Sequence, residues 1–126
     1  MKSKFSVSWK SSCQKRKQNK YRHNAPLHIK HKFLSVHFSK ELRTKYKKRS
    51  FPVRKGDLVK VMSGQFKGKT GKINAVLLKR TRVYIDNIQR NKQDGSKPFI
   101  PLHPSNLQLL DIDLTDKNRI KALERK

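Results

Sequence analysis

Glycine and lysine stand side by side in residues 53–73, which read VRKGDLVKVMSGQFKGKTGKI. Gly64, Gly68 and Gly71 fall within eight positions, and a lysine is next to each of the last two. Glycine supplies positive φ angles or room for close backbone approach, and lysine ammonium groups neutralise phosphates. The stretch is either a glycine turn with solvated lysines or a hairpin that brings backbone and cations to a phosphate. We expect the second.

A nucleotide-binding phosphate loop is a poor interpretation of the same stretch. That motif needs four residues between its glycines, then Lys and Ser or Thr, and then a helix. SGQFKGKT leaves only three residues between Gly64 and Gly68, and the following GKINAVLL alternates as a strand does. We therefore expect no ATP or GTP binding and no cofactor.

Catalytic and metal chemistry have little support in the residues. The eight acids are scattered at spacings that do not indicate acid/base catalysis, and Cys13 has basic neighbours but no evident base. Four histidines between residues 23 and 37 follow Cys13 at irregular spacing, unlike the ligand pattern of zinc sites. We expect neither an enzyme nor a metal site.

The charge of the chain indicates a polyanionic partner. The 126 residues carry 33 Lys+Arg against 8 Asp+Glu, a formal net charge of +25. Self-repulsion on this scale destabilises a free compact state, so a polyanion should supply part of the order. No apolar run approaches the ~18 residues of a membrane-spanning helix, and we expect a cytoplasmic protein of one modest domain that forms no homo-oligomer.

The cations are concentrated toward the N-terminus. Residues 1–50 hold 16 Lys+Arg and one acid, residues 51–110 hold 12 and three, and residues 111–126 hold five and four. Apolar residues are most frequent in the middle segment, which can best build a core. We divide the chain into a basic extension with short helices (1–50), a β domain (51–112) and a helical tail (113–126).

The basic extension predicts an arm followed by two short helices. CQKRKQNKYRHN, residues 13–24, has no apolar period, and we expect it to be extended until bound. Pro26 suits a first helical turn, which predicts a helix over 27–34. Ser39 is a good N-cap for a second helix with Glu41 in its first turn, where the helix dipole favours an anion.

The middle segment reads as short strands. Period-two patterns predict strands over 58–62, 73–77, 83–85, 99–102 and 107–110, with a tight connection at 79–81 and a turn at Asp94-Gly95. Five short strands separated by turns predict a mainly β fold, a small barrel. The tail should form a short exposed helix capped by Thr115 or Asp116. His103 should fix a turn before the last strand.

The residues also resemble a known family. RKGDLVKVMSGQFKGKTGKI resembles the KOW motif, which transcription elongation factors also contain. The longer resemblance is to the universal large-subunit ribosomal protein twenty-four family of archaea and eukaryotes, through NAPLHIKHKF (24–33), SKELRTKYKKRSFPVRKGD (39–57), VYIDNIQRNKQDGS (83–96) and IPLHPSNLQLLDIDL (100–114).

This resemblance implies a small SH3-like barrel with a basic, partly helical N-terminal extension. It also implies a non-enzymatic constituent of the large ribosomal subunit that binds the 5′ domain of large-subunit rRNA early in assembly, near the peptide exit tunnel. Neighbouring large-subunit proteins are then the expected protein partners. The alternative is a KOW-type transcription elongation factor or another RNA-binding protein.

The candidate RNA-binding residues are basic or aromatic side chains of the extension and the hairpins. Arginine grips phosphate with two hydrogen bonds or stacks on a base, so arginines are favoured for defined contacts. Tyr21 and His23 either stack on an unpaired base or pack against the arm. The candidates are Lys15, Arg16, Lys17, Lys20, Tyr21, Arg22, His23, His28, Lys30, Lys32, Arg43, Lys47, Lys48, Arg49, Arg54, Lys55, Lys67, Lys69, Lys72, Lys79, Arg80 and Arg82, with turn glycines Gly56, Gly64, Gly68, Gly71 and Gly95.

Overall fold

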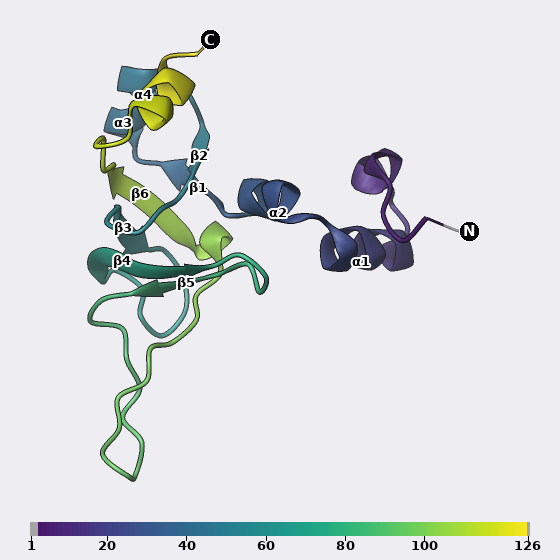
Figure 1. Cartoon of the computed structure of the whole chain (residues 1–126). Coiled ribbons are helices and arrows are strands. Elements are labelled where there is room, and N and C mark those ends of the chain that lie inside the picture. Colours follow the sequence, from purple (N-terminus) through teal and green to yellow (C-terminus); the bar gives the residue numbers. More distant parts are fainter. Residues whose placement is uncertain (1–2, 126) are drawn as a thin grey trace.

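The chain folds into a small sheet domain with a helical N-terminal projection (Figure 1). The structure is a computed structural model that describes residues 3–125. The elements in chain order are η1 (Val7–Ser11), α1 (Lys15–Asn24), α2 (Leu27–Phe33), β1 (Ser35–Phe38), α3 (Lys40–Tyr46), β2 (Ser50–Pro52), β3 (Leu58–Val61), β4 (Thr70–Leu77), β5 (Arg82–Ile85), η2 (Pro104–Asn106), β6 (Leu107–Asp111) and α4 (Lys117–Glu124).

The strands form one mixed six-stranded sheet in the order β2-β1-β6-β3-β4-β5. β1 and β6 are parallel, and every other neighbouring pair is antiparallel. The expected mainly β fold, with a partly helical N-terminal extension and a short C-terminal helix, is confirmed. Within residues 3–125 the order begins with β2 and ends with β5, so the sheet does not close into the barrel that we expected.

β4 joins β5 to the rest of the sheet because it pairs with β3 and with β5. Its first residues, Thr70 to Lys72, pair with β3, and its later residues pair with β5. The register shifts between Ile73 and Ala75. An irregularity of this kind bends a strand and increases its twist, and the single long strand thereby changes partner along its length.

The core follows the alternation that the sequence predicts. Val59 and Val61 of β3 are buried, as are Leu107 and Leu109 of β6, while their neighbours along each strand are more exposed. The predicted hairpin of β3 and β4 and the tight connection between β4 and β5 are confirmed. Burial of these branched side chains is the main stabilising term, at about 1.5–3 kcal/mol for each.

The sequence analysis missed β1, which lies inside the sheet between β2 and β6. Val36 and Phe38 of this strand are fully buried, and β1 pairs with β6 more than 70 positions away in the chain. A four-residue strand gives little local pattern, and its parallel partner is distant in the sequence. The first 50 residues therefore contribute a strand to the core as well as the predicted helices.

The predicted strand over 99–102 is wrong. The segment forms isolated bridges, from Leu102 to Val83 of β5 and from Phe99 to Gln89 beyond β5, and no continuous ladder. Pro98 and Pro101 flank the bridges, and proline has no N–H to donate to a ladder. The predicted turn at Asp94-Gly95 is present, with Gly95 at a φ of 81°. The connection from β5 to β6 consequently projects as a long loop beyond the sheet (Figure 1).

The predicted extended arm is also wrong, because residues 15–24 form α1. A single buried aromatic residue, Tyr21, anchors the helix, so the sequence of α1 shows no apolar periodicity. The side-chain nitrogen of Gln18 donates to the carbonyls of Trp9, Lys10 and Ser12 at 3.0, 2.8 and 2.8 Å, which fastens η1 to α1. Contacts of this kind leave no trace in hydrophobic periodicity.

The two later helices begin where the sequence predicts. The Ser39 hydroxyl accepts from the Leu42 N–H at the start of α3, and the Asp116 carboxylate accepts from the Asn118 N–H at the start of α4. The expected exposure of α4 is wrong, since Leu123 is 2% exposed and Arg119 is 4% exposed. α4 is therefore packed on the domain rather than free in solvent. Among the described helices, none is long and apolar enough to cross a membrane.

Gly71 lies inside β4 and not in the turn that we predicted. A Cβ atom at this position would stand 2.7 Å from the Asp86 carbonyl oxygen and 2.7 Å from Cγ2 of Ile85. Overpacking of a close-packed interior costs about 1–3 kcal/mol. We expect Gly71→Ala to lower the free energy of unfolding by that amount, measured by urea denaturation. Thr70→Ala, at an exposed neighbouring position, is the control, and equal stability of the two variants would contradict the steric argument.

Candidate nucleic-acid interface

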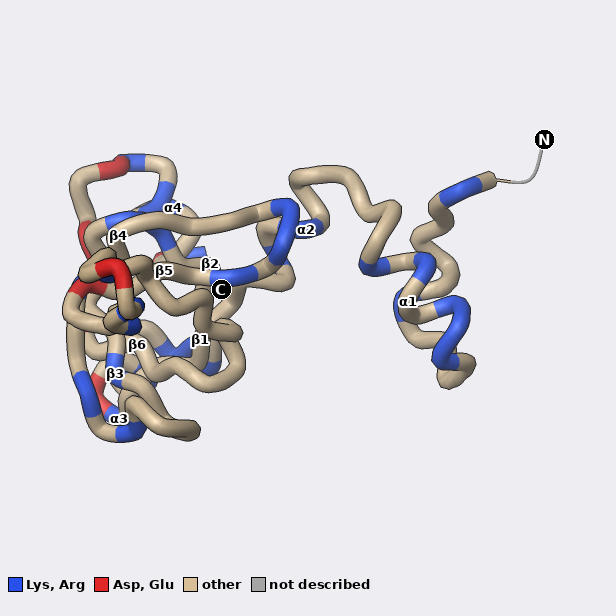
Figure 2. The backbone as a smooth tube through the Cα atoms, turned by 90° about the horizontal axis from the view of Figure 1, so that it is seen from below, with Lys and Arg blue, Asp and Glu red and all other residues tan. Residues whose placement is uncertain are grey.

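The N-terminal projection is a cationic surface held together by aromatic contacts. The Tyr21 ring stacks on Phe5 with centroids 5.1 Å apart and meets the edge of Phe33 at 5.9 Å. The Lys20 ammonium lies 5.0 Å from the centre of the Trp9 ring. Residues 3–40 contain no acid. No Asp or Glu position therefore occurs along the backbone of the projection, and Lys and Arg positions recur along it (Figure 2).

Most of the candidate basic residues of this projection are exposed. Those on α1 and α2 that face solvent are Lys15, Arg16, Lys17, Lys20, Arg22, His23, His28 and Lys32, while Lys30 is half-buried. Tyr21 is 4% exposed, and Phe5 covers one face of its ring. We gave two interpretations of Tyr21, which were stacking on an unpaired base and packing against the arm. In this structure Tyr21 packs within the arm. Its place in the interface is that of an anchor for the basic helix.

The residues between β3 and β4 form a closed hairpin loop with exposed lysines on the side that leads into β4. Gly64 and Gly68 have φ angles of 90° and 87°, so both occupy the conformation that glycine adopts without strain. The Gly68 N–H donates to the Val61 carbonyl at 2.8 Å, which closes the loop. Lys67 and Lys69 are exposed, and the Lys69 ammonium lies 5.3 Å from the centre of the Phe66 ring. Both cations thus extend from a rigid support.

The remaining candidates fall on three further segments. Arg43, Lys47 and Arg49 are exposed around the end of α3, whereas Lys48 is half-buried and its ammonium donates to the Ala122 carbonyl of α4. Lys48 is therefore engaged within the protein. Lys72 of β4 is exposed, and so are Lys79 and Arg80 in the turn between β4 and β5, while Arg82 is half-buried.

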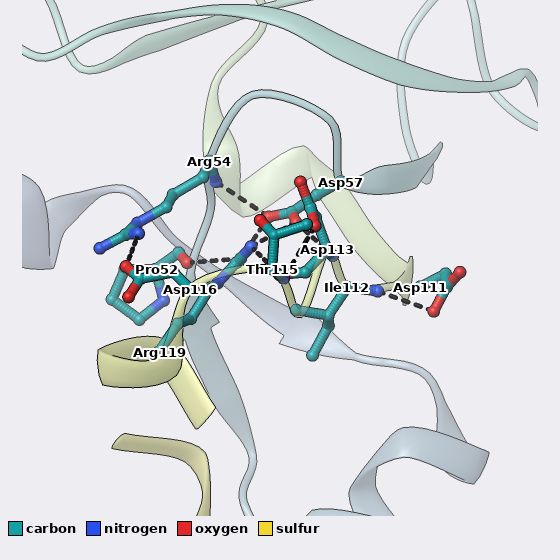
Figure 3. Close-up of polar contacts among 9 residues, drawn as sticks. All are labelled: Pro52, Arg54, Asp57, Asp111, Ile112, Asp113, Thr115, Asp116 and Arg119. Carbon is teal, nitrogen blue, oxygen red and sulfur yellow. Dashed lines mark hydrogen bonds and ion pairs between the residues drawn. The ribbon is translucent and has the colours of Figure 1, made fainter. Parts of the chain in front are cut away.

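Arg54 and Lys55 lie exposed on the loop before β3, and Figure 3 shows what holds that loop. Asp57 accepts from the Arg54 N–H at 2.8 Å and from the Asp113 N–H at 3.1 Å. Gly56, at a φ of 94°, allows the chain to turn between them. The Arg54 side chain also pairs with Asp116 at the start of α4, and this contact lowers the pKa of the Asp116 carboxyl.

Asp57 and Arg119 form a buried ion pair that the sequence analysis did not find. The guanidinium donates to both carboxylate oxygens, at 2.7 and 2.5 Å, and to the Asp113 carbonyl at 2.9 Å. Asp57 is 0% exposed and Arg119 is 4% exposed. Two-point pairing of this kind is strong and directional. It ties α4 to the loop that presents Arg54 and Lys55.

His31 is a second residue absent from our candidates. It lines a cleft of about 710 Å³ that also includes Arg54 and Lys55. Burial, and then the positive charges of Arg54 and Arg119, lower the pKa of His31. The lowered pKa favours the neutral imidazole, which offers a hydrogen bond beside the exposed Arg54 and Lys55 without adding charge. His31 belongs to α2, and its place beside the loop before β3 could not be deduced from local spacing.

Comparison with known proteins identifies the family to which a chain with these features belongs. Residues 12–126 match the family of the eukaryotic ribosomal proteins L26 and their archaeal L24-type counterparts. The chain belongs to this family. It is also 50% identical over 115 residues to "Large ribosomal subunit protein uL24" of Methanosphaera stadtmanae, across 91% of this chain and 98% of that protein. The resemblance drawn from the sequence segments is thereby confirmed.

Membership of this family makes the chain a ribosomal protein and not an enzyme. The match includes α1, both hairpins and α4, so it covers nearly all of the cationic surface described above. The match does not indicate a transcription elongation factor, which was our alternative interpretation. The exposed cations are consistent with an rRNA-binding protein of the large subunit.

Proposed function

We propose that this protein is a structural constituent of the large ribosomal subunit that binds the 5′ domain of large-subunit rRNA. Within this proposal it joins early in assembly, lies near the peptide exit tunnel, contacts neighbouring large-subunit proteins and acts as a monomer in the cytoplasm. The observation that carries the RNA contact is the surface of residues 3–40, which exposes many cations and has no acid.

The physical mechanism is phosphate neutralisation by a prearranged surface. Each Lys or Arg that meets a phosphate releases counterions, so affinity falls steeply with salt. The β3–β4 loop adds cations on a rigid hairpin, and α1 adds them on a helix fastened by Tyr21 and Gln18. Double-stranded RNA is recognised mainly by shape and by its sugar-phosphate backbone, and two rigid cationic elements suit that mode.

The β3–β4 loop provides the test of this proposal. We expect Lys67→Glu together with Lys69→Glu to weaken binding to a 5′-domain rRNA transcript on the order of 100-fold, because like charges placed across an interface cost several kcal/mol. Filter binding at fixed salt measures the affinity. Incorporation of the variant into large subunits, followed by sedimentation, measures assembly and should fall in parallel.

A matched control separates this loop from total charge. Lys117→Glu with Lys121→Glu makes the same change on the exposed side of α4, at positions outside our candidate set. This control should bind and assemble nearly as the natural protein does. Equal losses in the two variants would show that only net charge matters, and normal binding by the loop variant would leave the loop lysines as solvated side chains.

A further inference from the structure

A cleft lies where the N-terminal projection meets the turn between β4 and β5. Its volume is about 320 Å³, and its lining includes Lys10 of η1, Arg22 of α1 and Lys79 of the turn. The lining contains no carboxylate. Three separate segments thus bring positive charge around one small hollow, which is the arrangement expected for a site that accepts a phosphate group.

The wall of the cleft also carries aromatic surface. Phe33 and Tyr21 both line it, and Phe33 is half-buried, so part of its ring stays accessible. Small-molecule sites combine apolar and aromatic walls with a few polar groups that fix orientation. The cleft therefore offers both cations that can bind a phosphate and an aromatic ring on which a base can stack.

His103 supplies a hydrogen-bond donor at the same cleft. Its Nδ1 accepts from the Ser105 N–H at 3.3 Å, so the proton of the neutral ring resides on Nε2. Burial, and then the charges of Arg82 and Arg22, lower the pKa of His103. The lowered pKa favours the neutral imidazole, in which Nε2–H is the hydrogen-bond donor of the ring.

The turn that carries Lys79 is held in an unusual backbone conformation. Thr81 has a φ of 49°, which is uncommon for a β-branched residue. The Thr81 carbonyl accepts from the Arg82 guanidinium at 3.1 Å, and this contact stabilises the turn. Backbone strain that persists in a structure often occurs at binding sites. Here the strained residue itself lines the cleft.

We propose that this cleft binds one unstacked nucleotide of RNA, with the base against Phe33 and the phosphate between Lys10 and Lys79. Specific RNA recognition generally uses unpaired nucleotides whose bases stack on aromatic or arginine side chains. The dimensions and lining of the cleft suit one such nucleotide and exclude a duplex. The inference rests on the proposed RNA-binding function and adds a single-stranded contact to it.

Phe33→Leu tests the stacking contact because leucine keeps apolar packing against Tyr21 and removes the ring face. The probes are a single-stranded oligouridine and a short blunt-ended RNA duplex, each titrated with the full chain at one salt concentration. Loss of a base-aromatic stack is expected to weaken oligouridine binding roughly 5- to 150-fold. Duplex binding should change less than about twofold, because a paired base does not enter the cleft.

Phe99→Leu is the matched control, since Phe99 is another half-buried aromatic ring outside the cleft and outside the candidate interface. It should alter neither affinity. Equal weakening of both probes by Phe33→Leu, or no weakening of oligouridine binding, would overturn the nucleotide site. Circular dichroism of each variant checks that the fold is retained.

Ultraviolet crosslinking of oligouridine to the unaltered protein gives a test that needs no variant. Peptide mapping should place the crosslink on Phe33 or Tyr21, and crosslinks confined to other segments would contradict the site. A different result would contradict the proposed function, namely equal affinity of the protein for the 5′-domain transcript and for an unrelated transcript of equal length. The two failures are therefore distinguishable.

Discussion

Replacing Arg119 by alanine is expected to lower the free energy of unfolding by about 3–5 kcal/mol, the usual cost of removing one partner from a buried ion pair. Asp57 has no exposed surface, so its carboxylate would remain in the interior without its main counter-charge. The alanine would also leave the Asp113 carbonyl without the Arg119 donor at 2.9 Å. Urea denaturation of the purified chain measures the change.

The ion pair between Arg54 and Asp116 is the natural control. Both side chains are partly exposed, at 48% and 34%, and water screens such a pair. Arg54→Ala should therefore cost no more than about 1 kcal/mol. A double-mutant cycle with Asp57→Ala and Arg119→Ala should give a coupling energy of roughly 0.5–3 kcal/mol. Additive effects of the two substitutions would show that the pair does not act as a unit.

The ion pair between Asp57 and Arg119 also helps to position two of the candidate RNA-binding residues. Asp57 accepts from the Arg54 and Asp113 backbone N–H groups, and Arg119 brings α4 against the same loop. One buried carboxylate thus links the loop before β3, the segment after β6 and the C-terminal helix (Figure 3). Arg54 and Lys55 gain a defined position without themselves being buried.

Local signals explain which parts of the fold could be predicted from the sequence. Ser39 and Asp116 cap helices through hydrogen bonds to residues two or three positions away, and such caps are visible in a short window. Gly64 and Gly68 adopt the positive φ angles that a short hairpin loop needs. The alternation of Val59 and Val61 marks one face of β3, and the structure buries both.

The features that could not be predicted depend on partners that are distant in the chain. β1 is a strand because β6 and β2 pair with it, and its own four residues carry too little pattern. Asp57 and its partner Arg119 are 62 positions apart, so no local pattern indicates that they pair. The cleft lined by Lys10 and Lys79 joins two segments that no spacing rule connects. Long-range packing decides all three.

The helix α1 combines a feature that the sequence predicts, its charge, with one that only the structure shows, its rigidity. Its charge was evident from composition, whereas its rigidity comes from Tyr21 and Gln18. A cation on a helix that is already formed loses less conformational freedom on binding than one on a disordered arm. We therefore assign α1 a large share of the salt-dependent affinity for RNA.

Replacing the five exposed Lys and Arg residues of α1 by glutamine should flatten the salt dependence of RNA binding. If each meets one phosphate, the slope of log K against log salt should fall in magnitude by about 3.5–4.5. Glutamine is a good helix former, and Tyr21 and Gln18 are retained, so the helix should persist. Binding to the 5′-domain transcript over a salt series measures the slope. The substituted residues are Lys15, Arg16, Lys17, Lys20 and Arg22.

A second set of five exposed cations removes the same charge elsewhere and tests whether the effect belongs to α1. This control set is Lys92, Lys97, Lys117, Lys121 and Arg125, all outside the candidate interface. The control should change the slope by less than about one, because these cations lack a phosphate partner in the proposed complex and act only through screened, longer-range attraction. Equal slopes for the two variants would mean that RNA responds to the total charge of the chain, and α1 would then be an anchored helix without a defined RNA contact.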